Sequence, residues 1–182
     1  MTALADTSDG RRPVERWNPD HCGEIDIVIK ADGSWWHEGS RITRKGMVEL
    51  FASVLRKDED EVTYLVTPVE KLSITVERAH FLAIRLDAKG EGQDQRLFFT
   101  TNIGDVVEAG ADNPIRVETD PITGEPDPYV TVWGRLEAAL SRPVFYELVD
   151  LAVERQTEAG MQLGVWGGGL FFPLGPPDSH ND

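Results

Sequence analysis

Aromatic and imidazole side chains follow a predicted turn near the N-terminus and could hold a planar ligand. Asp32 and Gly33 form the turn, and Trp35, Trp36 and His37 follow it. Side chains alternate between the two faces of a strand, so Trp36 should point opposite to Trp35 and His37. We expect one tryptophan to lie in the core. The other either covers an edge of the sheet or offers a flat surface on which a ligand ring stacks.

A basic cluster comes next and could hold an anion. Arg41, Arg44 and Lys45 lie at the start of the first predicted helix. A helix N-terminus presents unpaired N–H groups and the positive end of its dipole, so arginines there form a reasonable seat for an anion. The alternative is a surface cluster that balances an acidic chain.

A proline-containing corner at residues 67–71 carries further polar side chains. Pro68 cannot donate a ladder hydrogen bond, so it separates two strands or marks an edge. This corner could hold Thr67, Glu70 and Lys71 as donors and acceptors for a ligand. Alternatively, Glu70 and Lys71 form a solvated ion pair that contributes little to stability.

A glycine-rich stretch, GVWGGGL, spans residues 164–170. It lacks the Lys-Ser/Thr of a P-loop and the third glycine of GxGxxG. Either the glycines let a neighbouring backbone or aromatic ring approach a buried strand closely, or they form the floor of a ligand cleft beside Trp166.

Metal or nucleophilic chemistry has little support in the sequence. The histidines His21, His37, His80 and His180 form no HxH or HExxH pattern. Cys22 is adjacent to His21, but neighbours in an extended segment point apart, so we expect an inert thiol. There is no GxSxG nucleophile motif. We therefore expect no metal site, no cofactor and no catalytic residue.

Charge and composition exclude several classes of partner. The chain of 182 residues has 32 Asp and Glu against 18 Lys and Arg, a net charge of −14. Binding a nucleic-acid backbone requires a supply of basic side chains, so no nucleic-acid partner is expected. No apolar stretch approaches the roughly 20 residues that span a bilayer. One cysteine and no apolar leader indicate a reduced, cytoplasmic protein with no membrane partner.

Hydrophobic periodicity predicts a hairpin and a helix in the first half. Residues 24–30 alternate as a strand, and the turn at Gly33 leads into the aromatic strand. The predicted helix begins at Thr43 as N-cap and ends with a solvated acidic turn, residues 58–61. Its apolar stripe has helical spacing and should be buried: Met47, Leu50, Phe51, Val54 and Leu55.

The second half reads mostly as strands. Residues 62–66 and 72–76 alternate, and strands and turns continue from Phe81. Residues 129–140 are predicted as two strands that bend near Gly134, with a short helix from Gly134 as the alternative. A second helix begins at Pro143, buries Phe145 and Leu148, and ends at Gly160. A final apolar strand covers residues 161–172.

This order of elements predicts an α+β fold of two related modules, each made of antiparallel strands and one helix. The expected boundaries are a disordered N-terminus at 1–16, a first module at 17–79, a second at 80–175 and a tail at 176–182. Residues 27–42 and 97–115 resemble each other weakly. Each segment has a strand, a turn that contains Gly and Asp, a pair of identical apolar residues and then a glycine, which suggests duplication.

Several separate motifs, in order along the chain, resemble an uncharacterised bacterial family, DUF1285. They are residues 32–39 (DGSWWHEG), 50–55, 64–71 (YLVTPVEK), 142–148 (RPVFYEL) and 169–175 (GLFFPLG). The resemblance covers residues 15–175. Where the family is expected to have Ser-Gly-Gly or a similar sequence, residues 167–169 are all glycine, which leaves no hydroxyl there.

The resemblance implies two related α+β modules, the second like a pleckstrin-homology barrel closed by a helix. It also implies a cleft between them for a small, nucleotide-like ligand, and a link to signal transduction. We therefore expect a non-catalytic ligand-binding protein; an enzyme of unrecognised type or a protein-interaction module is the alternative. The oligomeric state is not predicted. The expected ligand-binding residues are Trp35, Trp36, His37, Arg41, Arg44, Thr67, Glu70, Lys71 and Trp166.

Overall fold

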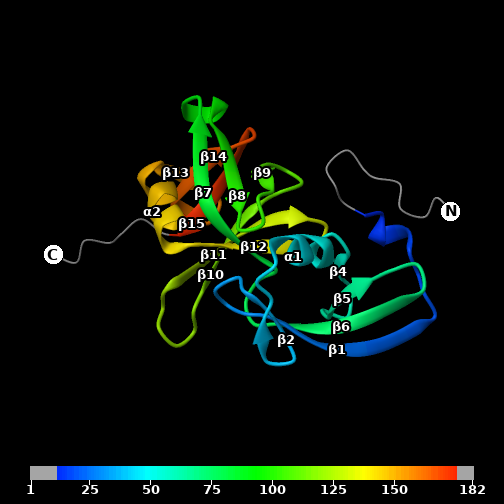
Figure 1. The fold of residues 1–182 in the computed structure, drawn as a ribbon. Coiled ribbons are helices and arrows are strands. Elements are labelled where there is room, and N and C mark those ends of the chain that lie inside the picture. Colours follow the sequence, from blue (N-terminus) through cyan, green and yellow to red (C-terminus); the bar gives the residue numbers. More distant parts are fainter. Residues whose placement is uncertain (1–11, 176–182) are drawn as a thin grey trace. The chain divides into compact units, whose positions relative to one another are not determined.

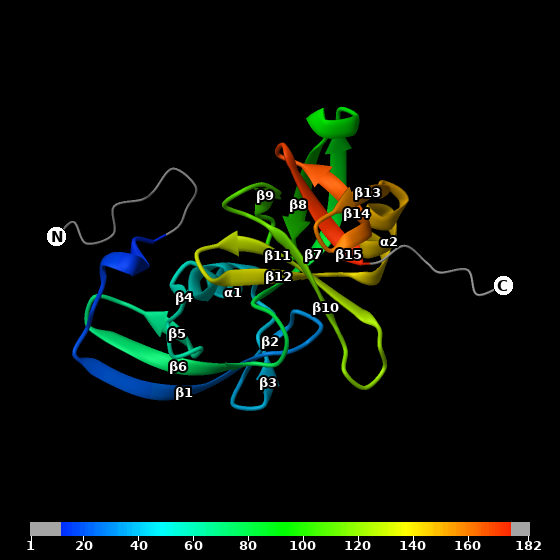
Figure 2. The same ribbon diagram turned by 180° about the vertical axis from the view of Figure 1, so that it is seen from behind.

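A computed structural model describes residues 12–175 (Figures 1 and 2). The expected tail at 176–182, including His180, and residues 1–11 lie outside the described residues. The chain divides into two compact units. The first comprises the residues up to His80 together with Gly134–Leu136, and the second comprises Phe81–Trp133 and the residues from Glu137 onward.

The first unit is one six-stranded sheet with an α-helix, and its strand order is β3-β2-β1-β6-β5-β4. All pairs are antiparallel except β1 with β6, which are parallel. The elements are η1 (Val14–Arg16), β1 (His21–Ile29), β2 (Trp35–His37), β3 (Ser40–Arg41), α1 (Lys45–Ala52), β4 (Leu55–Lys57), β5 (Thr63–Val66) and β6 (Glu70–Val76).

The predicted hairpin is confirmed and supplies the centre of this unit's core. β1 pairs with β2 so that Ile29 lies opposite Trp35, and Gly33 has φ of 86°, which the turn requires. Ile27, Ile29 and Trp35 are buried. Helix α1 covers the same face of the sheet, where the ring of Phe51 stacks on Trp35.

The first helix exists, but its predicted extent and its buried face are wrong. It begins after Arg44 rather than Thr43 and ends at Ala52, so Leu55 is buried as part of β4 instead. Leu50 is 53% exposed. Successive helical residues are rotated by about 100°, so a two-turn helix that contacts the sheet through Phe51 and Ala52 turns Leu50 away from it.

The second unit contains a six-stranded, curled half-barrel with strand order β10-β11-β12-β7-β8-β9, and a three-stranded sheet β13-β14-β15. Its elements are β7 (Phe81–Lys89), η2 (Gly92–Asp94), β8 (Arg96–Thr101), β9 (Val106–Glu108), β10 (Ile115–Thr119), β11 (Pro126–Trp133), β12 (Leu136–Leu140), α2 (Arg142–Asp150), β13 (Val153–Thr157), β14 (Gly160–Gly167) and β15 (Leu170–Gly175). Here β12 and β7 form the parallel pair.

Helix α2 packs against β7 and β14 within this unit (Figure 2). Its start is as predicted: Pro143 lies in the first turn, and the N–H of Val144 donates to the Ser141 hydroxyl. Val144 and Leu148 are buried, whereas Phe145 is half-buried. The strand-pair prediction for residues 129–140 is also confirmed, with Gly134 at φ of 57° in the turn.

The predicted end of the second helix at Gly160 is wrong. Helix α2 ends at Asp150, and β13 begins at Val153. Gly160 has φ of 100° and pairs with Thr157 across a tight hairpin turn, so this glycine turns a strand rather than ending a helix. The single strand predicted at residues 161–172 is also wrong, since β14 and β15 form a hairpin there.

The two-module α+β prediction is therefore confirmed: each unit has a six-stranded sheet and one α-helix. Residues 12–16, expected in the disordered N-terminus, include helix η1, in which Val14 is buried. None of the helices in the described residues has the length and apolar composition needed to cross a membrane.

Candidate functional site

The two tryptophans of the first hairpin lie on opposite faces of the sheet, as predicted. Trp35 is 2% exposed and stacks on Phe51 with ring centroids 6.3 Å apart, so it is the core tryptophan. Trp36 is half-buried, and its Nε1 donates to the Ser34 hydroxyl at 2.9 Å. The ammonium of Lys30 lies 4.0 Å from the centre of the Trp36 ring and covers one of its faces.

The other predicted residues of this region are solvent-exposed. Arg41 lies opposite Trp36 across β2 and β3, and His37 lies 3.9 Å from Glu38. Arg44 is the N-cap of α1 and makes no side-chain capping hydrogen bond. The structure therefore brings Trp36 and Arg41 together at one edge of the sheet, whereas His37, the next residue of β2, points to the other face.

The proline corner joins β5 to β6, and its side chains mostly serve the turn itself. The Thr67 hydroxyl accepts hydrogen bonds from the N–H groups of Val69 and Glu70, at 3.4 and 3.2 Å. The Glu70 carboxylate lies 4.0 Å from Nε2 of His21. Lys71 points instead to Asp58, and its Nζ donates to Oδ2 at 3.0 Å.

Trp36 and Arg41, at the edge of the sheet, lie far from the proline corner at residues 67–71. Trp36 pairs with Val28 on β1, and Val28 pairs with Thr75 on β6. Strand spacing puts β2 and β6 about 10 Å apart, and Lys71 lies roughly 13 Å along β6 from Thr75. A ligand on Trp36 would therefore have to be long to reach Lys71 as well.

Trp166 lies in the second unit, on the outer face of the three-stranded sheet. The guanidinium of Arg155 lies 4.7 Å from the centre of its ring, and the ring of Phe171 meets it edge-on at 5.4 Å. Its carbonyl accepts a hydrogen bond from Gln95 Nε2 at 2.9 Å. Trp166 is thus held by neighbours of its own unit.

The glycine run is explained by close backbone approach. Gly168 and Gly169 have φ of 57° and 81° and form the turn between β14 and β15. A Cβ on Gly168 would lie 2.7 Å from the carbonyl oxygen of Ala109, and one on Gly164 would lie 2.5 Å from the Phe171 ring. Both glycines are required sterically where they stand.

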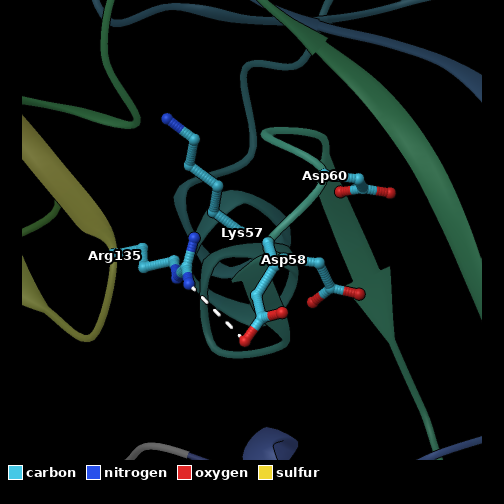
Figure 3. A pocket seen from close by; sticks show the side chains of 5 residues that line it. Lys57, Asp58, Asp60 and Arg135 are labelled. Atoms are coloured by element: carbon cyan, nitrogen blue, oxygen red, sulfur yellow. Dashed lines mark ion pairs between the residues drawn. The ribbon is translucent and has the colours of Figure 1, made fainter.

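A pocket of about 450 Å³ lies in the first unit, at the turn between β4 and β5 (Figure 3). The turn Gly134–Leu136, which groups with this unit, contributes one of its basic side chains. The lining residues are Lys57, Asp58, Glu59, Asp60 and Arg135.

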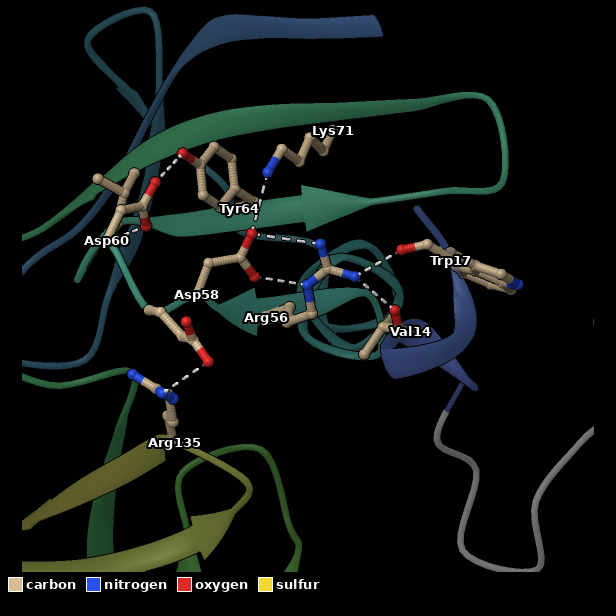
Figure 4. A network of polar contacts seen from close by, with 10 residues as sticks. Val14, Trp17, Arg56, Asp58, Asp60, Tyr64, Lys71 and Arg135 are labelled. Atoms are coloured by element: carbon tan, nitrogen blue, oxygen red, sulfur yellow. Dashed lines mark hydrogen bonds and ion pairs between the residues drawn. The ribbon is translucent and has the colours of Figure 1, made fainter. Parts of the chain in front are cut away.

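The back of this pocket is a hydrogen-bonded network centred on Asp58 (Figure 4). Arg56 Nε donates to Asp58 Oδ1 at 2.6 Å, and Lys71 donates to Oδ2. Arg56 Nη1 also donates to the carbonyls of Val14 and Trp17, both at 2.7 Å, which fixes η1 beside β4. Burial raises the pKa of Asp58, but the hydrogen bonds from Arg56 and Lys71 outweigh it and hold that pKa below its usual value.

A second carboxylate of the pocket is fixed by a tyrosine. The Tyr64 hydroxyl donates to Asp60 Oδ2 at 2.6 Å, and the N–H of Val62 donates to Oδ1 at 3.0 Å. These two hydrogen bonds lower the pKa of Asp60. The same contact raises the pKa of Tyr64 to about 12, because the phenol loses the hydrogen bond that it donates to Asp60 when it ionises.

Among the described residues, the two basic side chains that line the pocket are paired only with exposed carboxylates. Lys57 Nζ lies 3.0 Å from Glu61, and the Arg135 guanidinium lies 3.9 Å from Glu59 and 4.0 Å from Glu61. Glu59 is 94% exposed in its side chain. Ion pairs of this kind are worth little, so a ligand group can replace the glutamates at small cost.

The residue pattern does not predict this pocket. It indicates a solvated turn at the end of a helix for residues 58–61, whereas they connect β4 to β5. Lys71, a predicted ligand-binding residue, lies behind the pocket and donates to Asp58. The acidic run itself was the available signal for Asp58 and Asp60. Nothing in the sequence pairs it with Arg135.

Metal and thiol chemistry receives no structural support within residues 12–175. No group of three or more His, Cys, Asp or Glu side chains in that range is placed to hold a metal ion. Cys22 is exposed and unbridged. His80 is buried, with its Nε2 3.0 Å from the Thr63 hydroxyl.

Comparison with known proteins decides the family. Residues 12–79 match the N-terminal domain of unknown function DUF1285, and residues 80–174 match the C-terminal domain of the protein of unknown function DUF1285. The chain belongs to the DUF1285 family. None of the curated proteins matches this DUF1285 chain.

Two solved structures are similar to this DUF1285 chain. A DUF1285 family protein from Silicibacter pomeroyi DSS-3 is 46% identical, with 95% of this chain and 92% of that chain covered and a TM-score of 0.87. A DUF1285 family protein from Shewanella baltica OS155 is 24% identical, with 68% and 90% covered and a TM-score of 0.53. The second likeness concerns the fold alone.

Proposed function

We propose that this DUF1285 protein is a non-catalytic, small-ligand-binding protein that acts in the bacterial cytoplasm, and that the pocket lined by Lys57 and Arg135 is its binding site. The observation that carries the proposal is an open hollow of about 450 Å³ whose two basic side chains, within residues 12–175, are held only by exposed glutamates. That volume accommodates a small molecule, which would keep one side open to solvent.

The rigid back of the pocket supports the proposal further. Asp58 is fixed by Arg56 and Lys71, and Asp60 by Tyr64 and Val62 (Figure 4). A site whose walls are already fixed loses little conformational entropy when a ligand binds. The proposal includes no bond-making step.

A nucleotide is the ligand that the family resemblance implies, so it is included in the test. Its phosphates would meet Lys57 and Arg135, and the Arg135 guanidinium suits bidentate contact with a phosphate. A role in signal transduction would follow if a bound ligand altered the hydrogen bonds that Arg56 donates to the carbonyls of Val14 and Trp17.

The test is a thermal-shift screen of the full chain at low salt, with mono-, di-, tri- and cyclic nucleotides, orthophosphate and other charged metabolites. A ligand at 100 times its dissociation constant stabilises by about 2.7 kcal/mol. For a chain of this size the melting midpoint should rise by roughly 5–10 °C. Arg135→Gln and Lys57→Gln should abolish the shift.

Matched controls are Arg85→Gln and Lys45→Gln, which remove exposed basic residues that pair with Asp87 and Glu49. Both should respond to ligand as the wild type does. Absence of any shift at millimolar ligand would refute the proposed function. A shift that survives Arg135→Gln but disappears in Arg44→Gln or Trp36→Ala would move the site to the edge of the sheet.

A further inference from the structure

The two basic side chains and the two fixed aspartates of the pocket lie on different sides. In Figure 3, Lys57 and Arg135 lie on one side of the hollow, and the carboxylates of Asp58 and Asp60 lie on the other. The exposed carboxylates of Glu59 and Glu61 lie at the basic side, paired with Arg135 and Lys57. Arg135 comes from the turn before β12, whereas the carboxylates come from the turn after β4. A ligand that displaces the exposed glutamates would therefore meet Lys57 and Arg135 at one end and the fixed aspartates at the other.

The site as a whole is electrically balanced. The lining residues and their direct partners contribute four basic and four acidic side chains: Lys57, Arg135, Arg56 and Lys71 against Asp58, Glu59, Asp60 and Glu61. A purely anionic ligand would have to overcome the carboxylates, and a purely cationic one the basic groups. Complementarity favours a ligand that is neutral overall and carries both charges.

Asp58 and Asp60 differ in the number of further hydrogen bonds that their carboxylates can accept. Asp58 receives donors from Arg56 Nε, Arg56 Nη2 and Lys71 Nζ. Each oxygen of Asp60 receives one hydrogen bond, from Tyr64 or from Val62. A carboxylate has about four acceptor positions, so Asp60 retains capacity for an ammonium group. It is ionised at neutral pH, since its hydrogen bonds lower a pKa that is already acidic.

The basic side suits an acid group of planar geometry. The guanidinium of Arg135 presents parallel N–H donors that match the two oxygens of a carboxylate, and Lys57 adds a point charge beside it. The Glu59 carboxylate now lies 3.9 Å from this guanidinium. A ligand carboxylate would take its place at closer range.

We propose that the pocket binds a zwitterion of the α-amino acid class, with the ligand carboxylate on Arg135 and Lys57, in place of the glutamates that now pair with them, and the ligand ammonium on Asp60. This inference rests on the proposed function, since it names the ligand class of the same pocket. It requires that binding depend on both charges of the ligand.

The experiment compares matched ligands by isothermal titration calorimetry on the full chain. Each of the twenty α-amino acids is tested, and any that binds is compared with the acid that lacks its amino group and the amine that lacks its carboxylate. Removing either group should weaken binding at least about tenfold, because a charge-assisted hydrogen bond is lost.

Two variants test which residues bind the carboxylate and the ammonium of the ligand. Arg135→Gln should weaken amino-acid binding at least about tenfold and leave the affinity for the matched amine unchanged. Asp60→Asn should weaken amino-acid binding and leave the affinity for the matched carboxylic acid unchanged. Glu49→Gln, which alters an exposed carboxylate paired with Lys45, should change neither.

Failure of this inference is distinguishable from failure of the proposed function. If nucleotides bind through Arg135 and no amino acid binds, the assignment of a zwitterionic ligand is overturned, and the pocket remains the binding site. Equal affinity for an amino acid and its deaminated acid would also overturn it. If no nucleotide, amino acid or other metabolite binds, both are refuted.

Discussion

The ammonium of Lys71 lies 3.0 Å from Oδ2 of Asp58, at the back of the pocket of the first unit. Lys71 is 22% exposed and also lies 4.4 Å from the centre of the Tyr64 ring. Its ammonium is therefore engaged both by Asp58, in the turn after β4, and by the ring of Tyr64 on β5. Lys71 acts on the pocket through Asp58 rather than by reaching the hollow.

Replacing Lys71 should cost stability. Lys71→Met keeps an apolar side chain of similar length but removes a donor from a partly buried carboxylate and a cation from the Tyr64 ring, so the free energy of unfolding should fall by about 1–3 kcal/mol. Lys45→Met, at an 80% exposed lysine paired with Glu49, should change it by less than about 0.5 kcal/mol. Urea unfolding of both variants measures the difference, and equal effects would contradict the role of Lys71.

The lowered pKa of Asp58 predicts a loss of stability in acid. A carboxyl whose pKa is lower in the folded chain than in the unfolded chain stabilises the fold above the unfolded value, near pH 4. That contribution is lost as the pH falls through the lowered folded pKa. Urea unfolding between pH 7 and pH 2 should show a steeper acid loss for wild type than for Asp58→Asn. Parallel curves would contradict the assignment.

The two helices should respond differently to truncation of a leucine. Leu148 of α2 is fully buried, so Leu148→Ala should cost about 2–5 kcal/mol through the cavity it leaves. Leu50 of α1 is 53% exposed, so Leu50→Ala should cost less than about 1 kcal/mol. A Leu50→Ala loss as large as that of Leu148→Ala would show that the face of α1 bearing Leu50 is buried.

The glycine at position 164 should not tolerate a methyl group. A Cβ there would lie 2.5 Å from both the Phe171 ring and the carbonyl oxygen of Phe172, so Gly164→Ala should destabilise by about 1–3 kcal/mol. Gly46, within α1, has no neighbour within 4 Å of its ideal Cβ, so Gly46→Ala should stabilise by up to about 1 kcal/mol. Thermal unfolding of both variants shows whether each substitution lowers or raises stability. A neutral Gly164→Ala would contradict the close packing.

Much of the fold follows from local sequence signals. Asp32 and Gly33 mark the first hairpin, the alternation around Pro68 separates β5 from β6, and Pro143 begins α2. These signals depend on neighbours in sequence, which is why they are informative. The exposed Leu50 and the early end of α2 depend on what each helix packs against, and periodicity alone does not contain that information.

The candidate site was harder to predict for the same reason. Trp35 and Trp36 were placed on opposite faces correctly, because strand alternation is local. The pocket depends on Arg135 meeting residues 57–61, and that contact joins distant parts of the sequence. The sequence shows an acidic run and a turn at Gly134, and only the tertiary structure brings them together.

The most direct test of the proposed function is a ¹H–¹⁵N correlation spectrum of the full chain, titrated with the tightest ligand found in the metabolite screen. If the pocket is the binding site, the largest shifts should fall on the amides of residues 57–61 and on Arg135, and Arg135→Gln should abolish them. Shifts centred instead on Trp36 and Arg41, or on Trp166, would contradict the assignment of the site. A spectrum unchanged at saturating ligand would contradict binding itself.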